Sequence, residues 1–337
     1  MINSHIIPNF YLKQFATLKP NGKHYVWVYT KGSNPKKPPK PTQQWTKNTA
    51  YENGYFAYTL PDGKVEESLE EVLRLKEENA ADPLVSAKSD LFAHSELSRF
   101  KLASYAALLY SRTTQRLDWT KRNWLEIYAQ LGEVMKDEKF AAALVGHFNR
   151  KLGGDKSVAW IQHHMKELIQ QNATTVEGKN NFLQELIANV DTTRDQLLTR
   201  RMRILKAPAG SQFVTSDNPL VTFMELPNGE FLPGEGFGKP TTMMVFPIAP
   251  NACVFFGGAD PTVRHDVETK MVDKINWIVM ASAHHFVFAQ TEDAEIQKMA
   301  HELIGSCIFG KTAFLPRGPL PTAKDFLIKL LGLKVES

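Results

Sequence analysis

A long block with helical periodicity lies between two segments that read as strands, and this arrangement limits the possible folds most strongly. From about residue 68 to 205, apolar side chains recur at helical spacing, and five to seven helices fit. Short β-like runs separated by Pro and Gly flank the block, with HYVWVY at 24–29 before it and MMVFPI and ACVFFGG after it. This order predicts an α+β protein. We expect a central helical block packed on a mixed or antiparallel sheet formed mainly by the C-terminal third, with N-terminal strands joining or flanking it.

The chain reads as one domain over residues 1–337 with four sub-regions. These are an N-terminal strand and loop segment at 1–65, the helical block at 66–206, a β-rich segment with one helix at 207–315, and a closing helix at 316–337. Ser68 and Glu71 form a capping box that predicts the start of a helix at Ser68. Further helices are expected at about 182–205 and from Asp266 to about Ala283. We find no internal repeat.

Composition excludes some classes of protein. The 43% apolar content of 337 residues is sufficient for a sizeable core. A balance of 40 Lys and Arg against 36 Asp and Glu permits nucleic-acid or phosphate partners without requiring them. Two cysteines exclude a zinc ribbon and a disulfide framework. Because the N-terminus lacks the pattern of a signal peptide and no long apolar stretch occurs, we expect a cytoplasmic protein that makes no use of a membrane.

The sequence TSDNP at 215–219 places polar residues where a buried strand ends, between QFV and LVTF. Pro219 restricts Asn218 to extended geometry, so the side chains of Asp217 and Asn218 have a defined direction. A carboxylate at a strand end can coordinate a metal or act as a general base. The alternative is an Asx-turn in which Asp217 caps its own backbone.

Arg112 ends the apolar helix YAALLYSRTTQR and lies on its apolar stripe. Such an arginine either serves the carbonyls at a helix C-terminus or points inward to an anion. Its partner would then be a carboxylate such as Asp217, or a bound phosphate. Glu77 and Glu78 lie two turns into the helix that begins at Ser68, and either is a candidate inward acid, although such faces are usually solvated.

His5 precedes a proline-started turn whose aromatic residues indicate a docked segment, while Asn276 lies on the apolar stripe of the helix expected at 266–283. A buried amide needs partners, and backbone groups are commoner partners than a substrate. Arg194 and Arg201 share an apolar face of the helix expected at 182–205, where burial of their stems at a rim is the main interpretation.

Taken in order, several motifs resemble the uncharacterised bacterial family of unknown function DUF4238 over about residues 5–290. They are HIIPNFYLKQFA, AYENGYFAYT followed by EENA, YSRTTQR, QFVTSDNPL and INWIVMASAHHFVFA. The resemblance implies no established reaction. It implies that five polar residues belong to one pattern, namely His5, Arg112, Asp217, Asn218 and Asn276.

The chain departs from the family pattern at three places. Ser4 stands where the family has the first of two histidines, and Thr114 replaces a proline after Arg112 and Thr113. A histidine at 284 or 285 replaces an arginine that is common near the following strand. These departures argue against an intact two-histidine site.

Two functions fit this set. The first is a hydrolase of phosphoesters or nucleic acid, possible in a defence or toxin system, in which Asp217 with Glu77 or Glu78 would bind Mg²⁺ or Mn²⁺. His5 would be the acid or base and Arg112 would stabilise phosphate charge. The second is a non-catalytic sensor or interaction module, in which the same residues form a buried network and the N-terminal aromatic segment and the Lys-Pro loop meet a protein partner.

Overall fold

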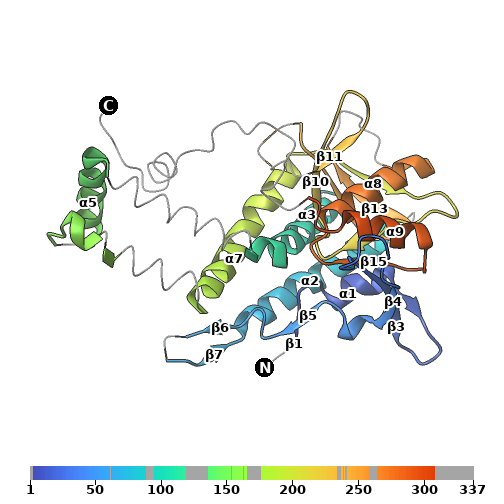
Figure 1. Ribbon diagram of the computed structural model, residues 1–337, viewed down its shortest axis with the longest axis horizontal. Helices are drawn as coiled ribbons and strands as arrows, with labels where there is room; N and C mark the ends of the chain where they lie inside the picture. The colour runs from blue at the N-terminus through green and yellow to red at the C-terminus, as the bar shows by residue number, and fades with distance from the viewer. Residues whose placement is uncertain are drawn as a thin grey trace. The chain divides into compact units, whose positions relative to one another are not determined.

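The computed structural model describes residues 3–60, 62–88, 95–118, 136–152, 154–161, 163–164, 176–233, 237, 239, 241–257 and 264–307. The chain forms two compact units. The first comprises Met1–Arg116 and Leu183–Thr312, and the second comprises Leu117–Phe182 and Ala313–Ser337. All four sheets of the described residues and all the predicted site residues belong to the first unit (Figure 1).

The larger sheet of the first unit has six strands and is mixed. In spatial order the strands are β11 (Phe231–Pro233), β10 (Val221–Glu225), β12 (Met243–Ala249), β13 (Ala252–Phe256), β8 (Met202–Lys206) and β14 (Arg264–Asp266). All neighbouring pairs are antiparallel except β14 with β8. Most of this sheet comes from the C-terminal third, as predicted.

The second sheet joins the two ends of the described chain. Its order is β2 (Thr17–Leu18), β3 (His24–Thr30), β15 (Phe286–Ala289) and β9 (Thr215–Ser216), and β4 (Thr42–Trp45) pairs with the other edge of β3. All these pairs are antiparallel. The prediction that N-terminal strands join C-terminal ones is therefore confirmed. Two small two-stranded sheets pair β1 (Asn3–His5) with β5 (Tyr51–Asn53) and β6 (Tyr58–Thr59) with β7 (Val65–Glu66).

Helices cover these sheets. They are α1 (Asn9–Leu12), α2 (Ser68–Lys88), α3 (Glu96–Ser111), α7 (Val176–Leu198), α8 (Thr269–Ser282) and α9 (Ala294–Leu303), with short 3-10 turns at Lys13–Phe15 and Thr46–Asn48. The helix α8 contacts β9, β10 and β11, and α9 contacts α8 and β3 (Figure 1). Their apolar faces meet Phe213, Phe223 and Val287 in one buried core. The α+β fold is confirmed.

Two predictions about helices are corrected by the structure. The helix at 182–205 ends at Leu198, because Met202–Lys206 pairs with both β13 and β14 as strand β8. Arg201 therefore lies outside the helix. A second helix in the β-rich segment, α9, was not predicted, although Asp293 caps it by accepting the amides of Glu295 (2.8 Å) and Ile296 (3.1 Å).

The first predicted helix starts at Ser68 as expected, but Glu71 pairs with Arg74 (2.6 Å) instead of closing the capping box. The closing helix at 316–337 lies outside the described residues. In the second unit, α5 (Glu138–Leu152) buries Phe140 and Leu144. Within the described part of the chain, no helix has the length and apolarity needed to cross a membrane.

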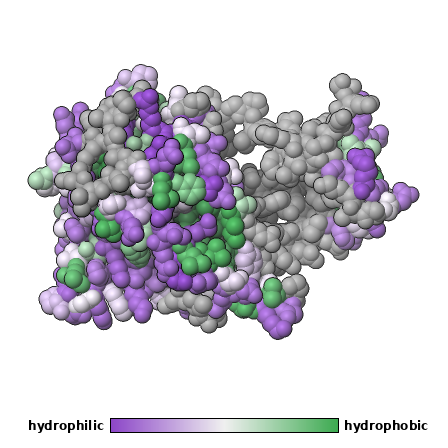
Figure 2. Space-filling view, turned by 180° about the vertical axis from the view of Figure 1, so that it is seen from behind, coloured by the Kyte–Doolittle hydropathy of each residue, from purple (hydrophilic) through white to green (hydrophobic). Residues whose placement is uncertain are grey.

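The surface carries scattered apolar side chains on a largely hydrophilic background (Figure 2). The large exposed apolar residues of α2, α3 and α7 are Val72, Leu75, Val85, Leu97, Phe100 and Ile187. Exposed apolar residues are normal in folded proteins. We assign them no role.

Candidate functional site

Asp217 is a buried acid whose carboxylate is fully engaged by the backbone. It follows β9 and is 4% exposed. Oδ1 accepts the amide of His284 (2.8 Å), and Oδ2 accepts the amides of His285 (2.7 Å) and Phe286 (3.2 Å). Burial raises the pKa of Asp217 to about 6, and the three amide bonds offset only part of this effect. The aspartate thus caps the segment that enters β15, rather than its own backbone.

Asn218 ties the same turn to two helices. Its Nδ2 donates to Gln115 Oε1 (2.9 Å) and to the carbonyl of Ser282 (3.2 Å) at the end of α8. The hydroxyl of Ser216 closes the turn by accepting the amide of Asn218 (3.1 Å) and donating to its carbonyl (3.0 Å). The polar strand end predicted at TSDNP therefore exists, and protein groups fill its bonding positions.

Asn276 points into the protein, as the helical periodicity predicted. Its Oδ1 accepts the amide of Val214 (2.9 Å), and its Nδ2 donates to the carbonyl of Gln212 (2.8 Å). The side chain of α8 thus acts as a strand partner for the segment before β9. The commoner interpretation of a buried amide, backbone bonding, describes this residue.

Arg112 is a buried cation, 1% exposed, at the end of α3. Its Nη1 donates to Glu77 Oε1 (2.5 Å), its Nη2 donates to the carbonyl of His5, and its guanidinium lies 4.6 Å from the centre of the Phe56 ring. The inward carboxylate is therefore Glu77 and not Asp217. Glu78 instead pairs with Arg74 on the exposed side of α2. For Glu77 the usual expectation of a solvated face is wrong, because α2 and α3 pack together.

His5 contributes through both its backbone and its ring. The carbonyl accepts from Arg112, and ring Nε2 lies 3.0 Å from the carbonyl of Lys47. Burial lowers the pKa of His5, and the bond to Lys47 opposes this effect. The N-terminal segment is docked rather than frayed: buried Tyr11 lies 2.7 Å from Thr215 Oγ1 and donates to the Pro247 carbonyl (2.5 Å).

Residues that the sequence did not indicate complete the surroundings of Arg112. Burial raises the pKa of Glu70, while the Ser4 side chain and Arg112 oppose the increase. Among the described residues, three atoms of this cluster are buried without a hydrogen-bond partner, namely Glu70 Oε1, Tyr105 Oη and Arg112 Nε. The helical period could have indicated Glu70 and Tyr105. Glu70 precedes Glu77 by seven positions on α2, and Tyr105 precedes Arg112 by seven positions at the end of α3, so each pair shares a helix face.

The predicted set thus divides between two networks. His5, Arg112 and Glu77 form one, and Asp217, Asn218 and Asn276 support the strand β9 in the other. Within the described part of the chain, no hydrogen bond joins Asp217 to a member of the first network.

The segment 112–118 after α3, a turn at Arg112 followed by helical residues from Thr114, connects the two networks covalently. Besides Arg112 it carries Gln115, which binds Asn218, and Thr114, whose Oγ1 lies 3.0 Å from His284 Nδ1. Thr114 stands at the position of the missing proline, and it contacts His284, which with His285 is a candidate for the position where the family pattern has an arginine.

The residues proposed for a divalent metal do not fit one. Both oxygens of Asp217 already accept backbone amides, and Glu77 neutralises Arg112. A hard cation needs several free oxygen ligands. In the described ranges, moreover, no three His, Cys, Asp or Glu side chains are grouped so as to hold a metal ion.

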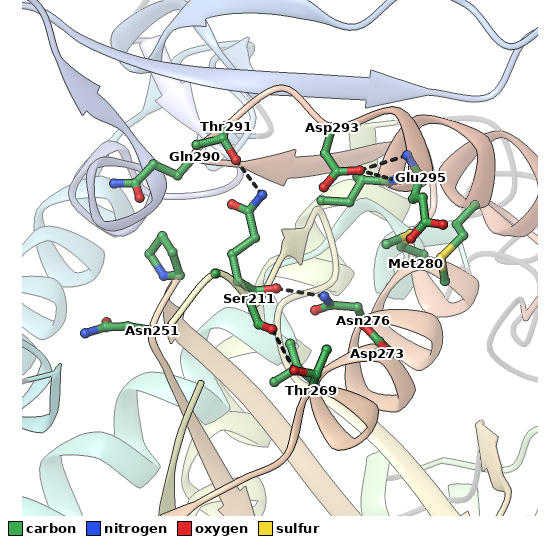
Figure 3. Close-up of a pocket in the computed structure, with 16 residues that line it drawn as sticks. Ser211, Asn251, Thr269, Asp273, Asn276, Met280, Gln290, Thr291, Asp293 and Glu295 are labelled. Atoms are coloured by element: carbon green, nitrogen blue, oxygen red, sulfur yellow. Dashed lines mark hydrogen bonds between the residues drawn. The ribbon is translucent and has the colours of Figure 1, made fainter. Parts of the chain in front are cut away.

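A cavity of about 510 Å³ lies beside α8, and Asn276 is one of its lining residues (Figure 3). Segments before β9, between β12 and β13, and at the start of α9 complete its wall. It is separate from Arg112 and Asp217, neither of which lines it.

Comparison with curated proteins and with solved structures gave no match. A family model described as a protein of unknown function, DUF4238, matches residues 3–293. That range includes every residue of the two networks. The chain belongs to the DUF4238 family.

Proposed function

We propose that this protein is a non-catalytic binding module, and that its His, Arg, Asp and Asn set is an internal framework for the fold. The observation that carries the proposal is the state of Asp217. Its two oxygens accept three backbone amides at 2.7–3.2 Å while the residue is 4% exposed. A carboxylate that is buried and already accepts three amides presents little surface to a metal or an attacking water.

The environment of Arg112 supports the same proposal. A guanidinium that stabilises phosphate must present donors to a ligand. Here Glu77, the His5 carbonyl and the Phe56 ring surround the group, and the side chain is 2% exposed. Buried ion pairs of this kind fix one packing arrangement of the elements that carry them.

Thermal unfolding of Asp217→Ala tests the proposal. The variant leaves three backbone amides at 284–286 without their acceptor, so we expect a melting temperature several degrees below that of the wild type. Asp82→Asn, on the exposed side of α2, is the control and should melt like the wild type. Mg²⁺, Mn²⁺ and a panel of nucleotides should change the melting temperature of neither protein. Two results together would refute the proposal. One of these ligands raises the melting temperature of the wild type, and the same ligand has no effect on an Asp217→Ala variant that is as stable as the wild type.

A second function, hydrolysis of phosphoesters or nucleic acid in the cytoplasm, has one specific observation in its favour. Burial raises the pKa of Glu70 toward neutrality, and Glu70 lies near the Arg112–Glu77 pair. Burial also lowers the pKa of His5, which keeps its imidazole neutral and able to accept a proton. Groups with pKa values nearer to neutrality are typical of acid–base catalysts. The substrate would be a phosphorylated small molecule, RNA or DNA. With RNA or DNA as the substrate, the nuclease activity would suit a role in defence.

His5→Gln separates this second function from the first. The variant keeps the backbone carbonyl that accepts from Arg112, and its amide can still donate to Lys47, so stability should change little. Phosphodiester hydrolysis by the wild type that is lost in His5→Gln at an unchanged melting temperature would favour the hydrolase. If the wild type hydrolyses no phosphodiester, the non-catalytic binding module remains the proposed function.

A further inference from the structure

The cavity beside α8 has an excess of negative charge. Asp273, Asp293 and Glu295 all line it, and no lysine, arginine or histidine is among its described lining residues. Neither Asp273 nor Glu295 has an ion pair or a side-chain hydrogen bond in the described part of the chain. Asp293 uses only Oδ1 to cap α9, at 2.8 and 3.1 Å, which leaves Oδ2 for another donor.

One local feature adds positive charge beside the cavity, but its charge is smaller than that of the three carboxylates. The N-terminus of α9 borders the cavity and carries roughly half a positive charge. Asp293 already satisfies two of its amides, and Glu295 adds a second carboxylate in the first turn. Two lysines of α8, Lys270 and Lys274, lie near Asp273 and line a neighbouring pocket that Asp273 shares. Lys274 donates to the Gly229 carbonyl (2.6 Å). Neither lysine lines the cavity itself, whose described lining has three carboxylates and no cationic side chain.

The polar groups of the wall point to a ligand larger than an ion. In the described ranges, the acids are not grouped to hold a metal. Asn276 is 7% exposed and uses one amide hydrogen and one oxygen lone pair within the protein, so each atom keeps a further bonding position. Gln212 also lines the cavity, and its amide donates to Thr291 Oγ1 (2.6 Å), which fixes the side chain in the wall.

The remaining wall is apolar. Val272, Met280, Ile296 and Met299 contribute to it, and the volume of about 510 Å³ lies within the range of roughly 300–1,000 Å³ that is usual for small-molecule sites. Thioether side chains adapt to different ligand shapes. Figure 3 shows Met280 and Glu295 on the same side of the cavity, so this side has both apolar and acidic lining residues.

We propose that this cavity binds an organic cation, an ammonium or guanidinium group on a short apolar stem that also carries an amide. The cation would meet Asp273 and Glu295, the stem would contact the apolar wall, and the amide would bond to Asn276. A lysine or arginine unit has this chemistry, whether as a free derivative or within a peptide. The inference rests on the proposed binding function, because it supplies the ligand site that function requires.

Calorimetric titration with matched probes tests the inference. Nα-acetyl-lysinamide and Nα-acetyl-argininamide carry the side-chain charge, and Nα-acetyl-norleucinamide is the uncharged match. The wild type should bind a charged probe and not the uncharged one. Asp273→Asn combined with Glu295→Gln should weaken binding by about tenfold at an unchanged melting temperature, because two exposed ion pairs are lost. Glu302→Gln, an exposed position of α9 outside the cavity, should bind like the wild type.

Two further arms identify the source of the ligand and keep the tests separate. A blocked Gly-Lys-Gly peptide that binds more tightly than Nα-acetyl-lysinamide would indicate a peptide, and weaker binding would indicate a free small molecule. Failure of the wild type to bind any charged probe, or equal affinity in the double variant, overturns the inference. Neither outcome alters the Asp217→Ala melting result, and phosphodiester hydrolysis would refute the proposed function without changing these titrations.

Discussion

Arg112 and Glu77 form an ion pair inside the protein, with Nη1 2.5 Å from Oε1 and an arginine side chain that is 2% exposed. The pair joins α3 to α2, and the His5 carbonyl extends it to β1. Removing one charge from such a pair leaves the other buried and unpaired, which is more harmful than removing both.

Glu77→Gln should therefore lower the free energy of unfolding by about 3–5 kcal/mol. The control is Glu78→Gln one position along the same helix, because Glu78 pairs with Arg74 where the two side chains are 59% and 52% exposed. We expect at most about 1 kcal/mol there. Denaturant unfolding of both variants measures the difference, and equal effects would contradict a buried role for Glu77.

The raised pKa of Asp217 predicts that the stability of the folded protein depends on pH. Its pKa is raised from 3.8 to about 6 in the folded protein. The folded state therefore binds more protons than the unfolded state between these values, and the contribution of Asp217 to stability is lost as pH rises through about 6. Unfolding of the wild type and Asp217→Asn between pH 4 and 7 checks this. The stability of the wild type relative to the variant should decrease across that range, and an increase would show that the amides dominate.

Asn276→Ala should destabilise the segment before β9 by about 1–3 kcal/mol, because a buried amide and a buried carbonyl lose their partner. Amide hydrogen exchange gives a specific readout, with protection lost at Val214 in particular. Asn251→Ala, an exposed asparagine of the same cavity, is the control. Unchanged protection of Val214 would mean that α8 does not hold this segment.

Tyr11→Phe should lower the free energy of unfolding by about 1 kcal/mol, because the hydroxyl serves Thr215 and the Pro247 carbonyl in a fully buried position. Tyr25→Phe is a matched control, since the hydroxyl of Tyr25 has, among the described residues, only an exposed contact with Asn21 (3.4 Å). The prediction is contradicted when both variants unfold at the same denaturant concentration.

Local patterns in the sequence determined much of this structure. The start of α2 at Ser68, the strand His24–Thr30, most of α8 and the inward direction of Asn276 all follow from periodicity and turn residues, which act over a few positions. The order of strand and helix segments was sufficient to predict the α+β class.

Only the tertiary structure decided which partners the polar residues take. The choice of Glu77 over Glu78 depends on which side of α2 meets α3, and Arg112 reaches His5 across 107 positions of chain. The carboxylate of Asp217 is occupied by amides 67 to 69 positions away, which become neighbours only when β9 pairs with β15. Met202–Lys206 is likewise a strand because two strands flank it. Such contacts arise from long-range pairing, on which local sequence patterns carry no information.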